Sequence, residues 1–139
     1  MTKRLLFISI FAAMSTASIH AQETTRLKAD IPFSFHVGQS AMPAGTYGLQ
    51  GDSVGRGILT MRSDSGSGAA IFNTIPDSVL RPPVNGKLVF HKYGEEYFLS
   101  EVWTPNSTRV ATLAKPRKEL DLVAKGKIPE QTILIARLR

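Results

Sequence analysis

The sequence contains no cysteine, and this absence excludes several classes of protein. The chain has no disulfide framework, no thiolate metal site, no cysteine nucleophile and no cysteine to carry an N-terminal lipid anchor. Long apolar runs are also scarce. The run Leu5–Met14 has about half of the roughly 20 residues that a helix needs to cross a bilayer. We therefore expect no integral membrane span after removal of the N-terminal segment.

Sequence motifs for catalysis are missing as well. There is no HExxH metal motif, and the segment DSGSG (64–68) has the wrong frame for a serine nucleophile elbow. The segment GDSVGRG (51–57) lacks the Lys-Ser/Thr that completes a phosphate-binding loop. These absences predict no catalytic residue, no cofactor and no bound metal.

Acidic residues are fewer than basic ones, 11 against 17, which gives a formal net charge of +6. The densest cluster, KPRKELDLVAKGK (115–127), could contact an anionic surface, although a solvated helix face explains it more simply. No aromatic residue interleaves with these charges, so a stacking platform for single strands is absent and we expect no nucleic-acid partner.

The N-terminus has the organisation of a secretory signal peptide. Lys3 and Arg4 precede the apolar run Leu5–Met14, and a small, polar segment ends at Ala21. We expect cleavage after Ala21, with cleavage after Ala17 as the alternative. The mature chain then has 118 residues and a charge of 15 minus 11, or +4, because Lys3 and Arg4 are lost. The protein is expected to be exported, to the periplasm or the extracellular space.

Short β-branched and aromatic runs separated by turn residues predict one β-rich domain over residues 22–139. We expect a small antiparallel sandwich or partly open barrel of about eight strands, with one short helix near the C-terminus. The helix is predicted over Pro116–Lys125, with Pro116 at its first position, Leu120, Val123 and Ala124 on one face, and Gly126 just after its end. The predicted strands are Ile31–Val37, Thr46–Gln50, Ile58–Arg62, Ala69–Thr74, Lys87–Tyr93, Glu96–Thr104, Arg109–Ala114 and Thr132–Leu138.

The clearest local element is a hairpin over residues 87–103, KLVFHKYGEEYFLSEVW. Gly94-Glu95 fits a two-residue type II′ turn, which has glycine first. Regular pairing places Leu88, Phe90, Tyr97, Leu99 and Trp103 on one face, and Val89, Tyr93, Phe98 and Val102 on the other. Both faces are largely apolar, so we expect other elements to cover each of them and Phe90, Leu99 and Trp103 to be core residues.

The segments IPFSFHVG (31–38), MPAGTY (42–47), GILTMRS (57–63) and LVFHKYGEEYFLSEVW (88–103) resemble a known family. It is a family of small, exported, uncharacterised bacterial proteins with PF-x-F-x-VG, PAG-x-Y and LVF-H-x-YG segments. The sequence departs from this family at Pro116, where a small polar helix cap is expected. The resemblance implies export and a compact β-rich domain, and it implies no particular activity, substrate or partner.

Two histidines, His36 and His91, remain after cleavage. The predicted register scatters His36, His91, Glu96 and Glu101 over different faces, with Glu101 on the opposite face from His91, so a structural role is expected for both histidines. If a ligand does bind at the hairpin, the candidate residues are His91, Glu101 and Tyr97.

These observations favour a non-catalytic exported domain that binds an unknown protein or envelope component, or that has a surface or structural role. The alternative is a small-ligand carrier or a minor enzyme that uses a cavity in a β-barrel. The first needs an exposed strand edge or apolar patch, and the second needs a hollow interior with convergent polar groups.

Overall fold

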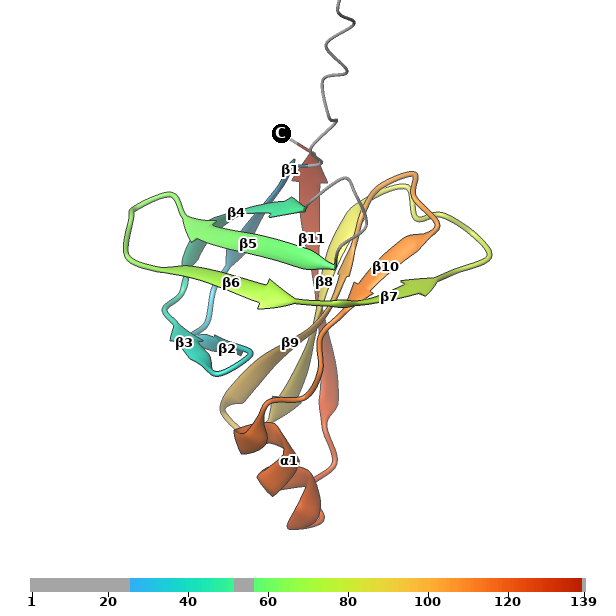
Figure 1. Cartoon of the computed structure of the whole chain (residues 1–139). Helices are drawn as coiled ribbons and strands as arrows, with labels where there is room; N and C mark the ends of the chain where they lie inside the picture. The colour runs from blue at the N-terminus through green and yellow to red at the C-terminus, as the bar shows by residue number, and fades with distance from the viewer. Residues whose placement is uncertain (1–25, 52–56, 139) are drawn as a thin grey trace, which may run out of the picture.

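The structure is a computed structural model that describes residues 26–51 and 57–138 (Figure 1). The expected signal peptide (1–21) and most of the GDSVGRG segment lie outside the described residues. The strands are β1 (Arg26–Ile31), β2 (Phe35–Val37), β3 (Ser40–Met42), β4 (Gly45–Gly51), β5 (Ile58–Ser63), β6 (Ala69–Asn73), β7 (Ile75–Ser78), β8 (Gly86–Tyr93), β9 (Glu96–Trp103), β10 (Arg109–Thr112) and β11 (Glu130–Leu138), and the helix is α1 (Arg117–Ala124).

Nine strands follow one another in a nearly closed, barrel-like sheet in the order β3-β2-β9-β8-β11-β1-β4-β5-β6. Strand β10 pairs with β9 and with the edge strand β7. All these pairings are antiparallel except the one between β2 and β9. The predicted fold class, a mainly β partly open barrel with one short helix near the C-terminus, is confirmed. No helix in the described part of the chain is both long enough and apolar enough to cross a membrane.

The prediction of a single strand over Ile31–Val37 is wrong, because residues Pro32–Ser34 interrupt it and separate β1 from β2. Proline has no backbone N–H to donate to a sheet and restricts the backbone dihedral φ. Strand β1 therefore ends beside β4, and β2 begins beside β9. Two short strands were not predicted: β3, which pairs with β2, and β7, which contains Pro76 at an edge that tolerates proline.

The β8–β9 hairpin has the predicted turn. Gly94 has φ of +63°, and among the described residues other than glycine only Asn106 has a positive φ. A positive φ at the first turn position alone is the type II′ geometry. The pairing follows the predicted register from Tyr93–Glu96 to Phe90–Leu99. It then shifts by one residue, so that Val89 lies opposite Glu101 rather than Ser100.

This irregularity reverses the predicted faces of the β9 residues beyond the shift, while Leu88 and Val89 of β8 keep theirs. Val102 joins Leu88, Phe90 and Leu99 in the core, whereas Trp103 pairs with Lys87 on the outer face and is only partly buried. Phe90 and Leu99 are core residues as predicted, and the prediction for Trp103 is wrong. A bulge inserts one residue into one strand and turns every following side chain to the other face.

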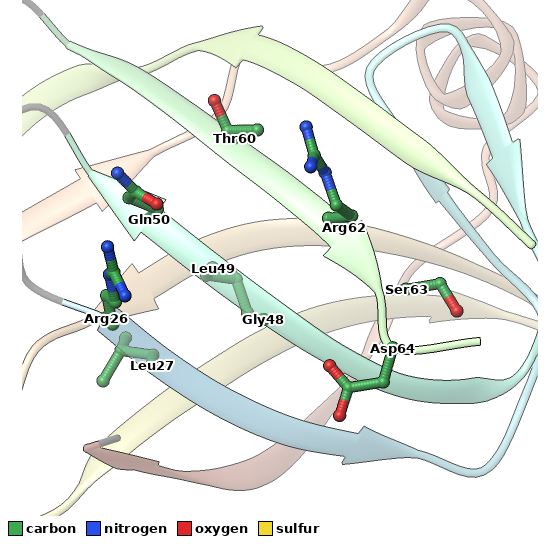
Figure 2. A pocket seen from close by; sticks show the side chains of 9 residues that line it. All are labelled: Arg26, Leu27, Gly48, Leu49, Gln50, Thr60, Arg62, Ser63 and Asp64. Carbon is green, nitrogen blue, oxygen red and sulfur yellow. The ribbon is translucent and has the colours of Figure 1, made fainter. Parts of the chain in front are cut away.

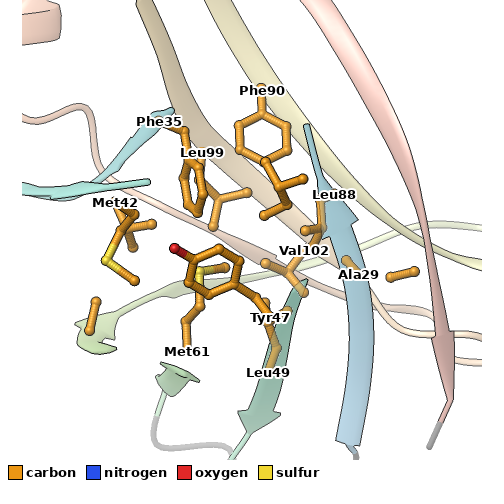
Figure 3. Close-up of a cluster of buried hydrophobic side chains, with 14 of the residues drawn as sticks. Ala29, Phe35, Met42, Tyr47, Leu49, Met61, Leu88, Phe90, Leu99 and Val102 are labelled. Carbon is orange, nitrogen blue, oxygen red and sulfur yellow. The ribbon is translucent and has the colours of Figure 1, made fainter. Parts of the chain in front are cut away.

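Side chains from both halves of the sheet fill the interior (Figure 3). The ring of Phe35 makes edge-to-face contacts with Tyr47 and Phe90, at centroid distances of 5.3 and 5.6 Å. The Tyr47 hydroxyl donates a hydrogen bond of 2.6 Å to the Pro43 carbonyl. The cavity among Leu27, Leu49, Gly51, Leu59, Val102, Thr104 and Ala111 has a volume of only about 50 Å³.

Candidate functional site

A buried carboxylate links the helix to the outer face of the hairpin. Glu119 of α1 is 2% exposed, and its Oε1 lies 2.7 Å from Nδ1 of His91. The Tyr93 hydroxyl donates to the same oxygen at 2.9 Å, and Lys115 Nζ lies 4.0 Å away. Burial, the hydrogen bond to Glu119 and its negative charge, in that order, raise the pKa of Tyr93 to about 12. We refer to Glu119, His91 and Tyr93 as the Glu119 cluster.

The helix faces the hairpin with the side that carries Glu119. Leu120 and Val123, which the sequence places on one face of the helix, are 51% and 42% exposed, whereas Glu119 is buried. A buried carboxylate requires hydrogen-bond donors, and His91 and Tyr93 can provide them at this position. The interpretation of residues 115–127 as a solvated helix face is therefore wrong for Glu119.

The helix ends follow the local sequence. Pro116 has extended dihedral angles and lies one residue before the helix rather than at its first position. At the other end, the N–H of Gly126 donates to the Val123 carbonyl and that of Lys127 donates to the Leu122 carbonyl. Gly126 has φ of +78°, so this end is the Schellman arrangement expected of a glycine after a helix.

A second histidine lies near the helix on the same face of the hairpin. The ring of His36 stacks on Phe98 at 4.7 Å between centroids. Burial lowers the pKa of His36, nearby Lys118 lowers it further, and Glu96 acts in the opposite direction. Lys118 itself forms an ion pair with Glu96, which joins α1 to the start of β9.

The predicted scatter of His36, His91, Glu96 and Glu101 over different faces is wrong. Glu96 pairs with Tyr93, His91 pairs with Phe98, and the bulge brings Glu101 to the same outer face. The four side chains nevertheless have different partners: Glu101 accepts a 2.6 Å hydrogen bond from the Trp103 indole, and Lys87 lies over that indole ring at 3.8 Å. Sharing a face therefore does not bring them to one point.

Tyr97, the third candidate ligand residue, lies on the inner side. Its ring stacks on Phe33 at 3.7 Å and packs against the core. The structure thus separates the three candidates, with His91 in the Glu119 cluster, Glu101 beside Trp103 and Tyr97 at the core.

A histidine held by a carboxylate is one component of many general acid–base sites. The Glu119 cluster has no nucleophile hydrogen-bonded to His91 among the described residues. Within residues 26–51 and 57–138, no group of three or more histidine or acidic side chains could hold a metal ion. The interactions of this cluster hold α1 against the hairpin.

A different feature, the edge of β11, is available for binding. Residues Glu130–Ala136 pair with β8 along one edge of the strand. Along the other edge, β11 pairs with β1 only at Leu138–Leu27 and Arg137–Lys28. Beyond these two pairs the strands diverge, and in the described chain no other strand pairs with this edge of Glu130–Ala136. Half of its backbone N–H and C=O groups therefore face an opening.

The opening between β1 and β11 is a cleft of about 330 Å³, lined by Lys28, Asp30, Leu134, Ile135, Arg137 and Leu138. Ile133 and Ile135 lie on the outer face of β11 and are 52% and 58% exposed. Natural proteins usually protect such an edge with a charge, a proline or a covering element. Residues 131–136 contain neither a charge nor a proline. We refer to Glu130–Ala136 as the open edge.

Sequence reasoning predicted the strand Thr132–Leu138 but not that one of its edges is open. The run of apolar and β-branched residues in TILIA was the available signal, because an exposed segment of this composition readily pairs with another strand. No protein-family model, curated protein or solved structure matches this chain.

Proposed function

We propose that the protein is an exported, non-catalytic binding domain that captures an extended segment of a partner protein at the open edge. In this mode of recognition, an added strand forms main-chain hydrogen bonds with a sheet edge, and alternate side chains give specificity. The single observation that carries the proposal is the divergence of β1 from β11, which leaves the edge of Glu130–Ala136 without a partner strand among the described residues.

The neighbouring side chains indicate the chemistry of the segment. Ile133 and Ile135 favour β-branched or aromatic residues at alternate positions of the added strand. Arg137 lies at the end of the edge and favours an acidic residue there. The partner is therefore an extended peptide with alternating apolar residues and one acid.

The packing of the interior supports this proposal over the alternative of a small-ligand carrier. Ligand cavities usually have volumes of about 300–1,000 Å³. The cavity bounded by core residues has about 50 Å³, and Tyr47, Phe35 and Phe90 are almost completely buried in the centre of the barrel.

Export is the part of the proposal that rests on sequence alone. Lys3, Arg4, the apolar run Leu5–Met14 and Ala21 predict a mature N-terminus at Gln22 outside the cytoplasm. Mass spectrometry of the protein from separated cell fractions tests this prediction. An intact Met1 on a cytoplasmic product would contradict it.

Selection of linear peptides from a displayed library on the purified mature chain (22–139) tests the binding proposal. Selected peptides should have alternating apolar residues, and they should protect the amides of Glu130–Ala136 from hydrogen exchange. Methylation of alternate peptide nitrogens should abolish binding, because it removes the main-chain donors.

The matched variants are Ile133→Lys and Leu80→Lys. Ile133→Lys places a charge beside the open edge and should weaken peptide binding at least about tenfold. Leu80 is fully exposed on a loop between β7 and β8, so the same substitution there should leave binding unchanged. Peptides that protect another region, or that bind Ile133→Lys as tightly as the parent chain, would overturn the proposal. Protection of the edge by a second copy of the chain, without peptide, would identify dimerisation instead.

A further inference from the structure

The outer face of β1, β4 and β5 contains a hollow of about 810 Å³ (Figure 2). The side chains of Arg26, Gln50, Thr60 and Arg62 point to the same side of this sheet. The register places Arg26, Gln50 and Thr60 in one row across the strands, and Lys28, Gly48 and Arg62 in the next row. The hollow is therefore surrounded by hydrogen-bonding and cationic groups and has a glycine in its floor.

The two arginines are spaced to act on one ligand. Strands lie about 4.8 Å apart and residues about 3.4 Å apart along a strand, so the Cα atoms of Arg26 and Arg62 are roughly 12 Å apart. Among the described residues, neither arginine forms an ion pair. Two long, flexible side chains at this spacing can converge on a group bound between them.

The described acids on this side of the sheet, Asp30 and Asp64, lie toward the opposite end of the strands from Arg26 and have partners. Asp64, which also lines the hollow, forms a 2.6 Å ion pair with Lys28. Asp30 accepts a 2.6 Å hydrogen bond from the Thr46 hydroxyl. The rows that contain Arg26 and Arg62 hold no acid on β1, β4 or β5, so this half of the hollow favours an anion.

Gly48 provides an independent indication of a ligand. It lies inside the central strand β4, where glycine destabilises a sheet, and its φ is not positive. A Cβ at Gly48 would lie 4.0 Å from the Arg62 carbonyl oxygen, an ordinary contact, so packing does not require glycine here. At Gly86, by contrast, a Cβ would lie 2.9 Å from the Ala136 carbonyl oxygen. Glycine inside a strand often marks a bulge, a tight bend, or a place where a ligand or another backbone approaches closely, and the pairing of Gly48 is regular on both sides.

We propose that this hollow binds a phosphate group, free or as part of a larger molecule, over Gly48 between Arg26 and Arg62. The guanidinium groups supply charge-assisted hydrogen bonds to the oxygens, and Gln50 and Thr60 provide neutral donors. This site lies on the outer side of the β1–β4–β5 sheet and does not depend on the open edge.

Titration of the mature chain with inorganic phosphate, followed by amide chemical shifts, tests the site directly. Millimolar phosphate should shift the resonances of Gly48, Gln50 and Arg62. Arg62→Gln should weaken binding about tenfold, because one charged donor is lost. Gly48→Thr should fold with an unchanged or higher thermal midpoint and also weaken binding at least about tenfold, because its side chain occupies the floor of the hollow.

Arg109→Gln is the charge-matched control, since Arg109 is exposed on β10 in another part of the barrel. It should leave binding unchanged, and an equal loss in this variant would overturn the proposal in favour of nonspecific attraction. Phosphate binding by folded Gly48→Thr at the parent affinity would overturn it too. If Gly48→Thr does not fold, Arg62→Gln decides between the outcomes.

A second arm distinguishes the source of the phosphate group. Vesicles containing phosphatidylglycerol test an anionic lipid headgroup, with vesicles of zwitterionic phosphatidylcholine, which have no net charge, as the comparison. Binding to the anionic vesicles that Arg62→Gln weakens, without a response to inorganic phosphate, identifies a membrane-surface ligand for the same site. No response in either arm overturns the proposal.

Discussion

The two outer faces of the barrel cover the same core but differ in composition. On β1, β4 and β5 the outward residues include Arg26, Lys28, Gln50 and Arg62, so these strands alternate between apolar and polar side chains. On β8 and β9 the outward residues include Tyr93 and Phe98, which are both buried. The difference arises because α1 lies over one end of the hairpin (Figure 1).

Coverage by a single short helix is incomplete. The Glu119 cluster lies at the turn end of the hairpin, while Ile133 and Ile135 remain exposed on the adjoining strand. The outer face of β8, β9 and β11 therefore has one part that is covered within the chain and one part that is open. This contrast can be tested by substitutions on the inner side, under the helix and away from the helix.

The largest effect is expected on the inner side, which both halves of the sheet share. Phe90 is completely buried, so Phe90→Ala should lower the free energy of unfolding by about 3–5 kcal/mol through lost apolar burial and a residual cavity. Urea denaturation of the mature chain measures this. Ile71→Ala, at a side chain that is 76% exposed, should change stability by less than about 0.5 kcal/mol. Similar losses in both variants would contradict the assignment of the core.

Removal of the buried carboxylate under the helix should have the next largest effect. Glu119→Ala leaves the hydroxyl of Tyr93 and the ring of His91 without their partner and should cost about 3 kcal/mol. Urea denaturation monitored by circular dichroism measures the loss. Asp121→Ala, at an exposed acid of the same helix, should cost less than about 0.5 kcal/mol. Equal stability of the Glu119→Ala chain and its parent would show that the cluster does not hold α1 in place.

A smaller effect is expected on the hairpin away from the helix. Trp103→Ala should cost about 1–2 kcal/mol, because only part of the indole is buried and its contact with Lys87 contributes modestly. The comparison with Phe90→Ala measures the consequence of the bulge. Without the bulge Trp103 would point inward, and a loss as large as that of Phe90→Ala would show that it does.

The smallest effect concerns pH. The pKa of His36 is lowered in the folded protein, mainly by burial, so the unfolded chain binds its proton more readily. The contribution of His36 to stability is fully present above about pH 6.5, and it is lost as the pH falls below this value toward the folded pKa. His36→Gln should therefore flatten the decline in stability between neutral and mildly acidic pH, as measured by thermal unfolding. A slope identical to that of the parent chain would contradict this assignment.

The sequence determined the features that depend on a few neighbouring residues. Gly94 specified the hairpin turn and Gly126 the helix end, because each takes a positive φ without steric cost. The short apolar and β-branched runs specified most strands, although Pro32 divided one of them. The β-rich class, the single short helix and the core position of Phe90 could all be predicted in this way.

The tertiary structure decided the features that depend on residues far apart in the chain. The β9 bulge sets the side of Glu101 and Trp103, and no local pattern marks where a register shifts. Glu119 is buried because the fold brings His91, 28 residues away, to its carboxylate. The open edge and the hollow over Gly48 exist because β1 pairs fully with β4 but only briefly with β11. Local sequence sets backbone dihedral angles, whereas these sites depend on which strands meet and where they separate.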